Sequence, residues 1–575
     1  MKVSDYIVKF FEEKKIDTVF GYLGGMITHL ADSIAKNPNV DFIQVYHEQT
    51  ASIAVEGYAR ENGNIGVAIA TSGPGATNMI TGIADAYFDS IPALYITGQV
   101  NTYEYKYDKP IRQLGFQETD VVSLVKGITK YATMITDESK IRYELEKAYF
   151  IAKEGRQGPV LLDIPMNIQR AEINPDILEG FIPNEKKEKI YDLEEINQLL
   201  KKAKRPMLLV GGGCINSNSQ TEINSFVEKS GIPVVSSLMG KGSVDETKDE
   251  YMGMLGSYGN RCANIAVANA DLLIALGTRL DTRQTGAMVN EFLRNGKIIH
   301  IDIDEAELQN HRIENKINIS MDAKQFIGKL QKETLNILEW KTYLKDLKKN
   351  YNQEKEIEKN IKNKAPYKLI ETLNKYSKEG EVFTGDIGQN QMWTAQSLIL
   401  KKNQKFFTSG GLAPMGYSLP CSIGVAFAKK NDEAIYSING DGGFHMAIQS
   451  LLLISQYNLP IKVIIMNNSA LGMITQFQEL YFENRLTGTV KDGGYIIPNL
   501  KEIASAYGVK YYKITEAELS DESLMENIFS QRNCLIDYQI EGESRVYPKL
   551  EFNSPLENTS PKLPEDELKK LMIKC

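Results

Sequence analysis

The segment Ser437–Gly472 places an acid and two amides at the ends of neighbouring apolar runs. It reads SINGDGGFHMAIQSLLLISQYNLPIKVIIMNNSALG, so that Asp441 lies between glycines and Asn467 and Asn468 follow 26 and 27 residues later. "EAIYSI" and "IKVIIM" are typical of buried strands, and a strand, helix and strand in succession bring Asp441 and Asn468 to one edge of a parallel sheet. The apolar positions between the strands predict one helix because they recur at i, i+3, i+4, i+7 and i+8: Phe444, Ala447, Ile448, Leu451 and Leu452.

Oxygen atoms at such an edge suit a magnesium ion that carries a diphosphate. Mg²⁺ prefers an octahedron of oxygen ligands and commonly combines one or two protein side chains with phosphates. Gly440, Gly442 and Gly443 let the backbone approach a ligand closely, and the start of the next helix presents free N–H groups to phosphate oxygens. A glycine turn with asparagines that cap strand ends is the structural alternative. The strand–helix–strand unit and the paired asparagines favour the metal-bridged diphosphate.

Length, charge and cysteine usage set the class of protein. A chain of 575 residues is too long for one core and predicts two to four domains of about 100–200 residues. A formal charge of −8 argues against nucleic acid or an anionic membrane as the main partner, and no apolar run reaches the ~20 residues that span a bilayer. The start, MKVSDYIVKFFEEKK, predicts an amphipathic helix rather than a signal peptide. The five cysteines show no CxxC or metal-ligand spacing, which favours reduced thiols in a cytoplasmic protein: Cys214, Cys262, Cys421, Cys534 and Cys575.

Three segments repeat one pattern, in which short apolar runs that end in glycine alternate with helical stretches. This alternation predicts parallel α/β sheets. The predicted domains cover residues 1–170, 190–345 and 365–550, and a C-terminal arm covers 551–575. The polar stretch Asn174–Asp192 is typical of a surface linker. The lysine- and glutamate-rich stretch Trp340–Lys364 predicts a solvated helix that crosses between domains.

The pattern GDG, followed after 24 residues by NN, resembles the diphosphate signature of thiamine diphosphate enzymes. The resemblance extends over nearly the whole chain and points to the large catalytic subunits of acetohydroxyacid (acetolactate) synthases in particular. It implies an α/β fold of three doubly wound parallel-sheet domains, which bind the thiamine pyrimidine, FAD or a nucleotide, and the diphosphate with Mg²⁺, in chain order. On that pattern the metal ligands are Asp441, Asn468 and the carbonyl of Ala470.

The same resemblance assigns the rest of the thiamine site. In "VYHEQTASIAVEGYAR" it makes Glu48 the acid that hydrogen-bonds the pyrimidine ring, although without its flanks Glu48 would be an ordinary helix-entry acid. Met415 would be the apolar wedge beneath the bent cofactor, and Phe116 and Gln117, which match the family's "FQE", would face the reacting carbon. The remaining cofactor positions are Gly73, Pro74, Asn78, Gly388, Gln389, Gly440, Gly442, Gly443 and Met473.

The middle segment contains "LLVGGGCINS", "LGTRLDTRQTG" and "IIHIDID", three strand ends that line an extended FAD in the synthase family. The arginines would pair with the flavin or its diphosphate, and an acid after a strand would accept from ribose or adenine. An empty structural domain, or one that holds only a nucleotide, is the alternative. The resemblance places FAD against Gly211, Gly212, Arg279, Arg283, Asp302 and Asp322.

Departures from the synthase pattern cluster where the second substrate should bind. Met166 replaces a lysine of the family's "DIPKD", Phe477 replaces a tryptophan, and "GMLGSYG" introduces Ser257. A loop after "TGQV" is about six residues longer and carries Lys106 and Arg112, whose charges would suit a bulkier phosphorylated acceptor. A solvated surface loop is the alternative reading of the same charges.

The resemblance implies decarboxylation of a 2-keto acid, with pyruvate the expected substrate, and carboligation of the two-carbon unit to a second carbonyl. A second pyruvate would give acetolactate, as in branched-chain amino-acid synthesis. Acetyl transfer to a ketosugar nucleotide and a flavin-linked pyruvate oxidase remain alternatives, as does a non-catalytic scaffold. Because Glu48 and Asp441 lie on different domains, the resemblance implies a homodimer or homotetramer with sites shared between subunits. The sequence names neither the acceptor nor a regulatory subunit.

Overall fold

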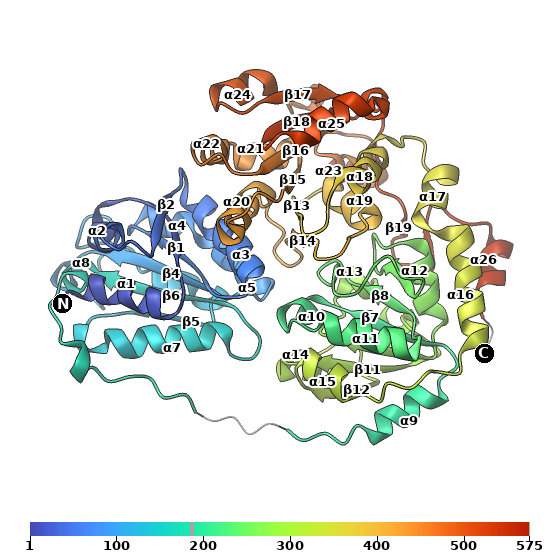
Figure 1. The fold of residues 1–575 in the computed structure, drawn as a ribbon, viewed down its shortest axis with the longest axis horizontal. Helices are drawn as coiled ribbons and strands as arrows, with labels where there is room; N and C mark the ends of the chain where they lie inside the picture. Colours follow the sequence, from blue (N-terminus) through green and yellow to red (C-terminus); the bar gives the residue numbers. More distant parts are fainter. Residues whose placement is uncertain (185–188, 574–575) are drawn as a thin grey trace.

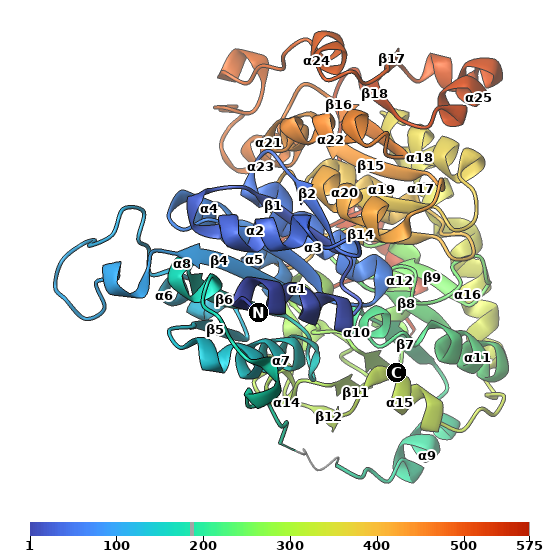
Figure 2. The same cartoon turned by 60° about the vertical axis from the view of Figure 1, so that its left-hand side comes forward.

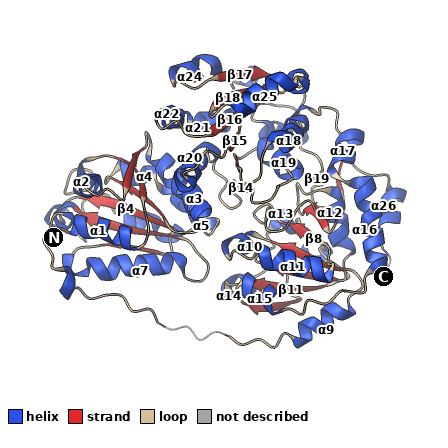
Figure 3. Ribbon diagram, in the orientation of Figure 1, coloured by secondary structure: helices blue, strands red, loops and turns tan. Residues whose placement is uncertain are grey.

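A computed structural model describes residues 1–184 and 189–573, and within these residues the chain forms three parallel six-stranded sheets, each with flanking helices (Figures 1 and 3). The predicted α/β class with three parallel sheets is confirmed. Each sheet lies inside one predicted domain range, while the exact boundaries stay predictions. Among the described residues, none of the helices has the length and apolar character needed to cross a membrane.

The N-terminal sheet has the strand order β2-β1-β3-β4-β6-β5. Its central strands are buried from end to end, as expected for parallel strands covered on both faces. The strands are β1 Thr18–Tyr22, β2 Asp41–Gln44, β3 Gly66–Ala70, β4 Ala93–Gln99, β5 Tyr131–Met134 and β6 Pro159–Pro165. The helices are α1 Val3–Glu13, α2 Thr28–Ala35, α3 Glu48–Asn62, α4 Pro74–Asn78, α5 Ile80–Phe88, α6 Val121–Val125, α7 Ile141–Lys153 and α8 Met166–Gln169.

The middle sheet has the order β12-β11-β10-β7-β8-β9. Its strands are β7 Pro206–Val210, β8 Val234–Ser236, β9 Tyr251–Met254, β10 Leu272–Leu276, β11 Lys297–Asp302 and β12 Lys316–Ser320. Its helices are α9 Glu194–Lys202, α10 Gly212–Asn216, α11 Gln220–Ser230, α12 Arg261–Asn269, α13 Thr282–Thr285, α14 Glu305–Gln309 and α15 Ala323–Lys329. Residues 185–188 of the predicted linker lie outside the described residues.

The C-terminal sheet has the order β14-β13-β15-β16-β18-β17, with β15 and β16 paired in parallel from Ile435↔Ile461 to Gly440↔Met466. Its strands are β13 Val382–Gly385, β14 Lys405–Thr408, β15 Ile435–Gly440, β16 Ile461–Asn467, β17 Tyr511–Ile514 and β18 Cys534–Gln539. Its helices are α18 Ala365–Tyr376, α19 Gln389–Ser397, α20 Ser418–Lys429, α21 Asp441–Met446, α22 Leu451–Gln456, α23 Gly472–Tyr481, α24 Leu500–Ala506 and α25 Glu522–Ser530.

Helices α3 and α20 join the first and third sheets, and they lie side by side in Figures 1 and 2. Glycines at the crossing leave no room for side chains. A Cβ on Gly57 would lie 2.0 Å from the carbonyl oxygen of Cys421, and one on Gly424 would lie 1.8 Å from that of Ala54. The two backbones therefore touch, which fixes α3 between the N-terminal and C-terminal sheets.

Two helix predictions were wrong. The single helix expected through Phe444 and Leu452 divides at Ala447, whose φ of −132° ends α21; a 3-10 turn over Ile448–Ser450 then leads into α22. Phe444, Ala447 and Leu451 of the predicted face are buried, but Ile448 and Leu452 are only half-buried. Ser450 bonds across the domain interface to Thr50, with their hydroxyl oxygens 3.2 Å apart. The spacing of apolar residues within one segment cannot predict a contact with a segment that is distant in the sequence.

The stretch Trp340–Lys364 is not a solvated helix. It forms α16 Leu338–Tyr351 and α17 Gln353–Asn360, and α16 buries Trp340, Leu344 and Leu347. Glu356 of α17 is also buried, because it forms an ion pair with the fully buried Arg261 at 2.6 Å. The C-terminal arm then packs over this region through β19 Lys549–Leu550, β20 Thr559–Ser560 and α26 Glu565–Leu571; its last two residues, including Cys575, lie outside the described part of the chain.

Candidate active site

Three oxygen atoms that carry no hydrogen converge at the carboxyl ends of β15 and β16. Asn468 Oδ1 lies 2.9 Å from the carbonyl oxygen of Ala470 and 3.3 Å from Asp441 Oδ2. Asn468 Nδ2 donates to Gln389 Oε1 and to Ser544 Oγ, both at 2.9 Å. Turning the amide over would let the nitrogen face the two acceptors, but the amide oxygen would then face Gln389 Oε1. The orientation described here satisfies Nδ2 and leaves three acceptors pointing at one another, an arrangement that a divalent cation neutralises.

Asp441 is held in a defined orientation at this edge. It is the first residue of α21 and is almost fully buried, and burial raises the pKa of its carboxyl group to about 6. The Tyr495 hydroxyl donates to Asp441 Oδ1 at 2.6 Å, so that Oδ2 faces Asn468 and Ala470. A buried, partly satisfied carboxylate beside two further oxygens fits a Mg²⁺ ligand set. The amino-acid pattern around Tyr495 gave no signal of this role, because it lies in an irregular loop.

The glycines beside Asp441 are required by close neighbours. A Cβ on Gly442 would lie 2.5 Å from Leu471 Cδ2 and 3.2 Å from Met415 Cε. A Cβ on Gly443 would lie 2.9 Å from the Asp386 carboxyl group, and Asp386 also accepts the Gly416 N–H at 2.9 Å. The structure thus brings Met415 to the start of α21, beside the place where the sequence predicts the diphosphate.

Gln389 and its neighbours complete this half of the site. Gly388 has a φ of +134° and precedes α19, so that Gln389 can reach both Asn468 and the Ser544 carbonyl. Met473 lies on α23 and packs against the core of the C-terminal sheet. Gly440 ends β15 immediately before Asp441.

A second half-site lies at the edge of the N-terminal sheet. Glu48 is the first residue of α3 and is 7% exposed, and its Oε2 accepts from Asn78 Nδ2 at 2.9 Å. Gly73, with a φ of +64°, opens the turn before Pro74 and α4, and a Cβ there would lie 3.2 Å from Gln117 Cβ. Glu48, Asn78, Gly73 and Gln117 are therefore neighbours. Phe116 projects outward and is 79% exposed.

The two half-sites lie on different domains of the chain. In the described part of the chain, no hydrogen bond or ion pair joins Glu48 to Asp441. Large apolar side chains are exposed on both domains. The exposed side chains include Leu114, Phe116 and Leu124 on the N-terminal domain and Ile474, Phe477, Leu480, Tyr481 and Phe482 on or beside α23.

A cavity of about 350 Å³ lies where all three sheets meet, and it collects most of the residues predicted to hold a flavin. Its wall includes Gly212, Arg279, Arg283, Asp302 and Asp322. Gly211 does not line it; a Cβ on Gly211 would lie 2.2 Å from the Gly277 carbonyl oxygen, so this glycine permits the turn beneath the cavity. Burial raises the pKa of Asp302 to about 6, and Asp322 caps α15 by accepting two backbone N–H groups.

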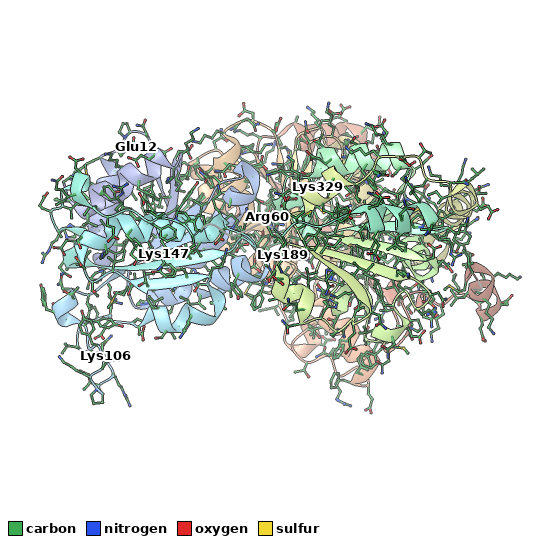
Figure 4. The ribbon with its side chains drawn as sticks, turned by 90° about the horizontal axis from the view of Figure 1, so that it is seen from below. Glu12, Arg60, Lys106, Lys147, Lys189 and Lys329 are labelled. Carbon is green, nitrogen blue, oxygen red and sulfur yellow. The ribbon has the colours of Figure 1, made fainter. Side chains whose placement is uncertain are left out.

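The N-terminal domain supplies a wall that the sequence did not predict. Arg60, Phe88, Asp89 and Arg156 line the cavity from that side, and Figure 4 shows Arg60 at the junction of the two halves of the molecule. Arg60 donates to the Thr408 carbonyl and the Tyr417 hydroxyl, both at 2.9 Å. These residues are far apart in sequence from the glycine-rich strand ends, and only the domain arrangement brings them together.

The predicted substrate residues do not form one cluster. Met166 follows β6, Ser257 lines the flavin-type cavity, and Phe477 lies on α23 with its ring 4.7 Å from that of Tyr481. Lys106 lies at the outer end of the N-terminal domain, remote from Arg60 (Figure 4), on the loop that also carries the exposed Arg112. Buried Glu118 holds the base of this loop by accepting the backbone N–H groups of Lys106, Leu114 and Gly115.

Three protein-family models match the chain, one within each of its three sheet-containing segments. Models of the thiamine pyrophosphate enzyme N-terminal TPP binding domain, central domain and C-terminal TPP binding domain match residues 1–124, 193–330 and 386–538. The acetolactate synthase large subunit of Corynebacterium glutamicum is 36% identical over 562 residues, which cover 95% of this chain and 88% of that protein. That of Lactococcus lactis is 35% identical over 95% of this chain and 94% of the relative, and the isozyme 2 large subunit of Escherichia coli is 35% identical over 95% and 97%.

Proposed function

The chain belongs to the thiamine pyrophosphate enzyme family, and from this premise we propose its reaction and its assembly. It is a thiamine diphosphate-dependent carboligase of the acetolactate synthase kind, which decarboxylates pyruvate and joins the two-carbon unit to a second carbonyl. The observation that carries this proposal is the convergence of Asp441 Oδ2, Asn468 Oδ1 and the Ala470 carbonyl oxygen. Acetyl transfer to a ketosugar nucleotide and flavin-linked oxidation of pyruvate are not favoured, because the relatives are acetolactate synthases.

Product analysis tests the reaction directly. The purified protein is incubated with pyruvate, thiamine diphosphate and Mg²⁺, and acetolactate is assayed by mass spectrometry. We expect acetolactate and carbon dioxide to accumulate together as pyruvate is consumed. Pyruvate left unconsumed would refute the assignment, and consumption without acetolactate would point to another acceptor.

Each proposed cofactor residue has a distinct part. Asp441, Asn468 and Ala470 would hold Mg²⁺, which neutralises the diphosphate, and the backbone at Gly442 and Gly443 would approach the phosphate oxygens. When bound, thiamine diphosphate supplies the electron sink that decarboxylation of a 2-keto acid requires. Glu48, oriented by Asn78, would share a proton with the pyrimidine ring, and Gln117 would hydrogen-bond the reacting groups.

We further propose that two chains share each active site. Two features support this proposal. Glu48 and Asp441 lie on different domains, and both domains expose large apolar side chains that a second copy of the chain would cover.

Mixing two inactive variants tests this sharing. Glu48→Gln and Asp441→Ala chains should each be inactive alone, but after subunit exchange about half of the dimers are mixed and each mixed dimer holds one intact site. Activity should therefore return to about a quarter of the wild-type rate. Glu48→Gln and Glu48→Ala chains mixed together serve as the control, which should stay inactive. An inactive Glu48→Gln and Asp441→Ala mixture, with exchange verified by mass spectrometry, would contradict a shared site.

The lining of the cavity between the sheets supports a flavin dinucleotide as its ligand. Glycines allow close packing in its wall, since a Cβ on Gly213 would lie 2.8 Å from Gly277 Cα and one on Gly410 would lie 2.6 Å from the Met239 side chain. Arg279 and Arg283 supply positive charge for a diphosphate, and the carbonyl of Arg279 is fixed by His311 Nε2 at 2.7 Å. We propose FAD as its ligand.

Replacing Arg279 by alanine should lower the flavin content without affecting thiamine diphosphate binding. Loss of a charged contact to the diphosphate should weaken flavin affinity about tenfold or more. Visible absorbance of the purified variant and titration with FAD measure this. Arg205→Ala is the control, because Arg205 lies just before β7, at the amino ends of the strands, whereas Arg279 follows the carboxyl end of β10. Equal flavin affinity in Arg279→Ala and wild type would remove Arg279 from the site.

Phe477→Trp tests whether α23 contacts the acceptor. Phe477 is 51% exposed, and a larger indole there would cover more of an apolar acceptor side chain. At ~25 cal/mol per Å² the gain is about 1 kcal/mol, so the ratio of acetohydroxybutyrate to acetolactate should rise about fivefold when 2-ketobutyrate and pyruvate compete. Leu480→Trp on the same helix controls for a general effect of an added indole. An unchanged product ratio would place the acceptor elsewhere.

We place the enzyme in the cytoplasm, with no nucleic-acid or membrane partner. The four cysteines in the described residues are unpaired and buried, which suits a reducing compartment. The formal charge of −8 does not favour binding to polyanions.

A further inference from the structure

A pair of buried carboxyl groups lies between the thiamine half-site on α3 and the flavin-type cavity. Glu56 on α3 and Asp85 on α5 are both fully buried. Among the residues that the structure describes, none donates a hydrogen bond to either Glu56 oxygen or to Asp85 Oδ2 when both groups are ionised. Neighbouring buried carboxylates without a donor are costly, and a proton on Glu56 would supply the donor that Asp85 Oδ2 lacks.

Asp85 continues this hydrogen-bond chain into the C-terminal domain. The Ser409 hydroxyl donates to Asp85 Oδ1 at 2.5 Å, and Ser409 Oγ in turn accepts the backbone N–H of Ala413 at 2.9 Å. The donors therefore run in a consistent direction from both ends toward Asp85: from Glu56 on one side, and from Ala413 through Ser409 on the other. The chain of contacts links α3 to the loop 409–416.

This loop is held in a strained conformation beside the half-site at Asp441. Ala413 has a φ of +62°, a region that side-chain-bearing residues rarely adopt without supporting contacts. Gly416 has a φ of +87°, and its N–H is bound by Asp386. Met415 lies between them and reaches to 3.2 Å from the Cβ position of Gly442. The Ser409 hydroxyl therefore accepts the backbone N–H of the strained Ala413, two residues before Met415, while Asp386 holds Gly416 on the other side.

We propose that Glu56 and Asp85 share one proton and, through Ser409, position the loop that presents Met415 to thiamine diphosphate. Glu56, Asp85 and Ser409 are positioning residues, since none of them lies among the residues assigned to the cofactor. The inference rests on the proposed function, because it assigns Met415 to the thiamine site.

The surroundings of the pair favour retention of this proton at neutral pH. Desolvation is the largest influence and raises the pKa of both Glu56 and Asp85, and the charge of Asp89 raises both further. Arg60 opposes the shift. Three other titratable groups face the pair: Tyr95 on β4, Tyr417 at the start of α20, and Cys421 within α20. Burial raises the pKa of each, so that they are neutral. A raised carboxyl pKa stabilises the protonated pair at low and neutral pH, and this stabilisation is lost as the pH rises through the folded-state value.

Two variants separate the proposal from a purely structural role. In Ser409→Ala the Ala413 N–H loses its acceptor, and the affinity for thiamine diphosphate, measured by isothermal titration calorimetry with saturating Mg²⁺, should fall about tenfold. In Glu56→Gln the amide donates to Asp85 without needing a proton. Its affinity should match that of the wild type at neutral pH and stay constant toward alkaline pH, where the wild-type affinity falls as the shared proton is lost.

Ser422→Ala is the matched control, because Ser422 is a buried hydroxyl on α20 that bonds Thr384 and not the loop. It should bind thiamine diphosphate as the wild type does. Wild-type affinity in Ser409→Ala, or the same alkaline loss in Glu56→Gln as in the wild type, would overturn the proposal. If the wild type itself bound no thiamine diphosphate, the proposed function would fail instead, so the two failures are distinguishable.

Discussion

Glu48→Gln should lower the rate of pyruvate decarboxylation at least a hundredfold, while the protein stays folded and still binds thiamine diphosphate. General acid–base groups contribute about 10²–10⁴ to rate, and glutamine cannot share a proton with the pyrimidine ring. Glutamine has nearly the same shape and can keep an acceptor for Asn78 Nδ2, which lies 2.9 Å from the glutamate oxygen. The folded structure should therefore survive. Steady-state release of carbon dioxide, together with calorimetric cofactor affinity, measures the two properties separately.

Glu61→Gln is the matched control for this change. Glu61 lies near the other end of α3, where it pairs with Lys405 at 3.1 Å, away from the thiamine half-site. Its removal should leave turnover unchanged. Normal turnover by Glu48→Gln would remove Glu48 from the mechanism, and a collapse of folding in that variant would call for Glu48→Ala and a direct test of cofactor binding.

Asp441→Ala should weaken binding of thiamine diphosphate at least a hundredfold in the presence of Mg²⁺. It removes one of three converging oxygens, and even residues that only support metal ligands typically cost 10–100-fold in metal affinity when they are changed. The free protein should not lose stability, because burial raises the pKa of Asp441 and penalises its ionised form at neutral pH. Calorimetric titration and the unfolding midpoint measure the two effects.

Removal of the metal provides an internal check on the same residue. After treatment with a chelator, the wild type should bind thiamine diphosphate as weakly as Asp441→Ala, and added Mg²⁺ should restore only the wild type. Asp432→Ala, which removes an exposed acid on the same domain, should respond as the wild type does. Identical Mg²⁺ dependence of Asp441→Ala and wild type would contradict the metal assignment.

Most of the fold could be predicted, because continuous apolar strands such as Pro206–Val210 and Leu272–Leu276 are typical of parallel sheets covered on both faces. Errors occurred where contacts between distant segments decided local structure. The break at Ala447 accompanies the contact between Ser450 and Thr50, some 400 residues apart. The many charged residues of the stretch Trp340–Lys364 predict a solvated helix. They outnumber the apolar residues that α16 buries, and the sequence gives no sign that Glu356 pairs with the buried Arg261.

The candidate site was predictable where glycine turns mark it. Asp441 lies between two glycines, Gln389 follows Gly388, and Asn468 follows the neighbouring strand β16. The structure brings the three residues together. Tyr495 and Ser544 belong to irregular segments and were missed, although both contact this group. The N-terminal wall of the cavity was missed for a different reason, since Phe88 and Asp89 end a helix of another domain and acquire their place only when α3 packs against α20.

An anomalous diffraction experiment tests the central claim most directly. A crystal of the protein grown with Mn²⁺, in place of Mg²⁺, and thiamine diphosphate should show an anomalous peak bonded to Asp441 Oδ2, Asn468 Oδ1 and the Ala470 carbonyl oxygen, with two diphosphate oxygens beside it. A map with no peak among these three atoms at saturating metal and cofactor, or with the Asn468 amide nitrogen turned toward Asp441, would contradict it.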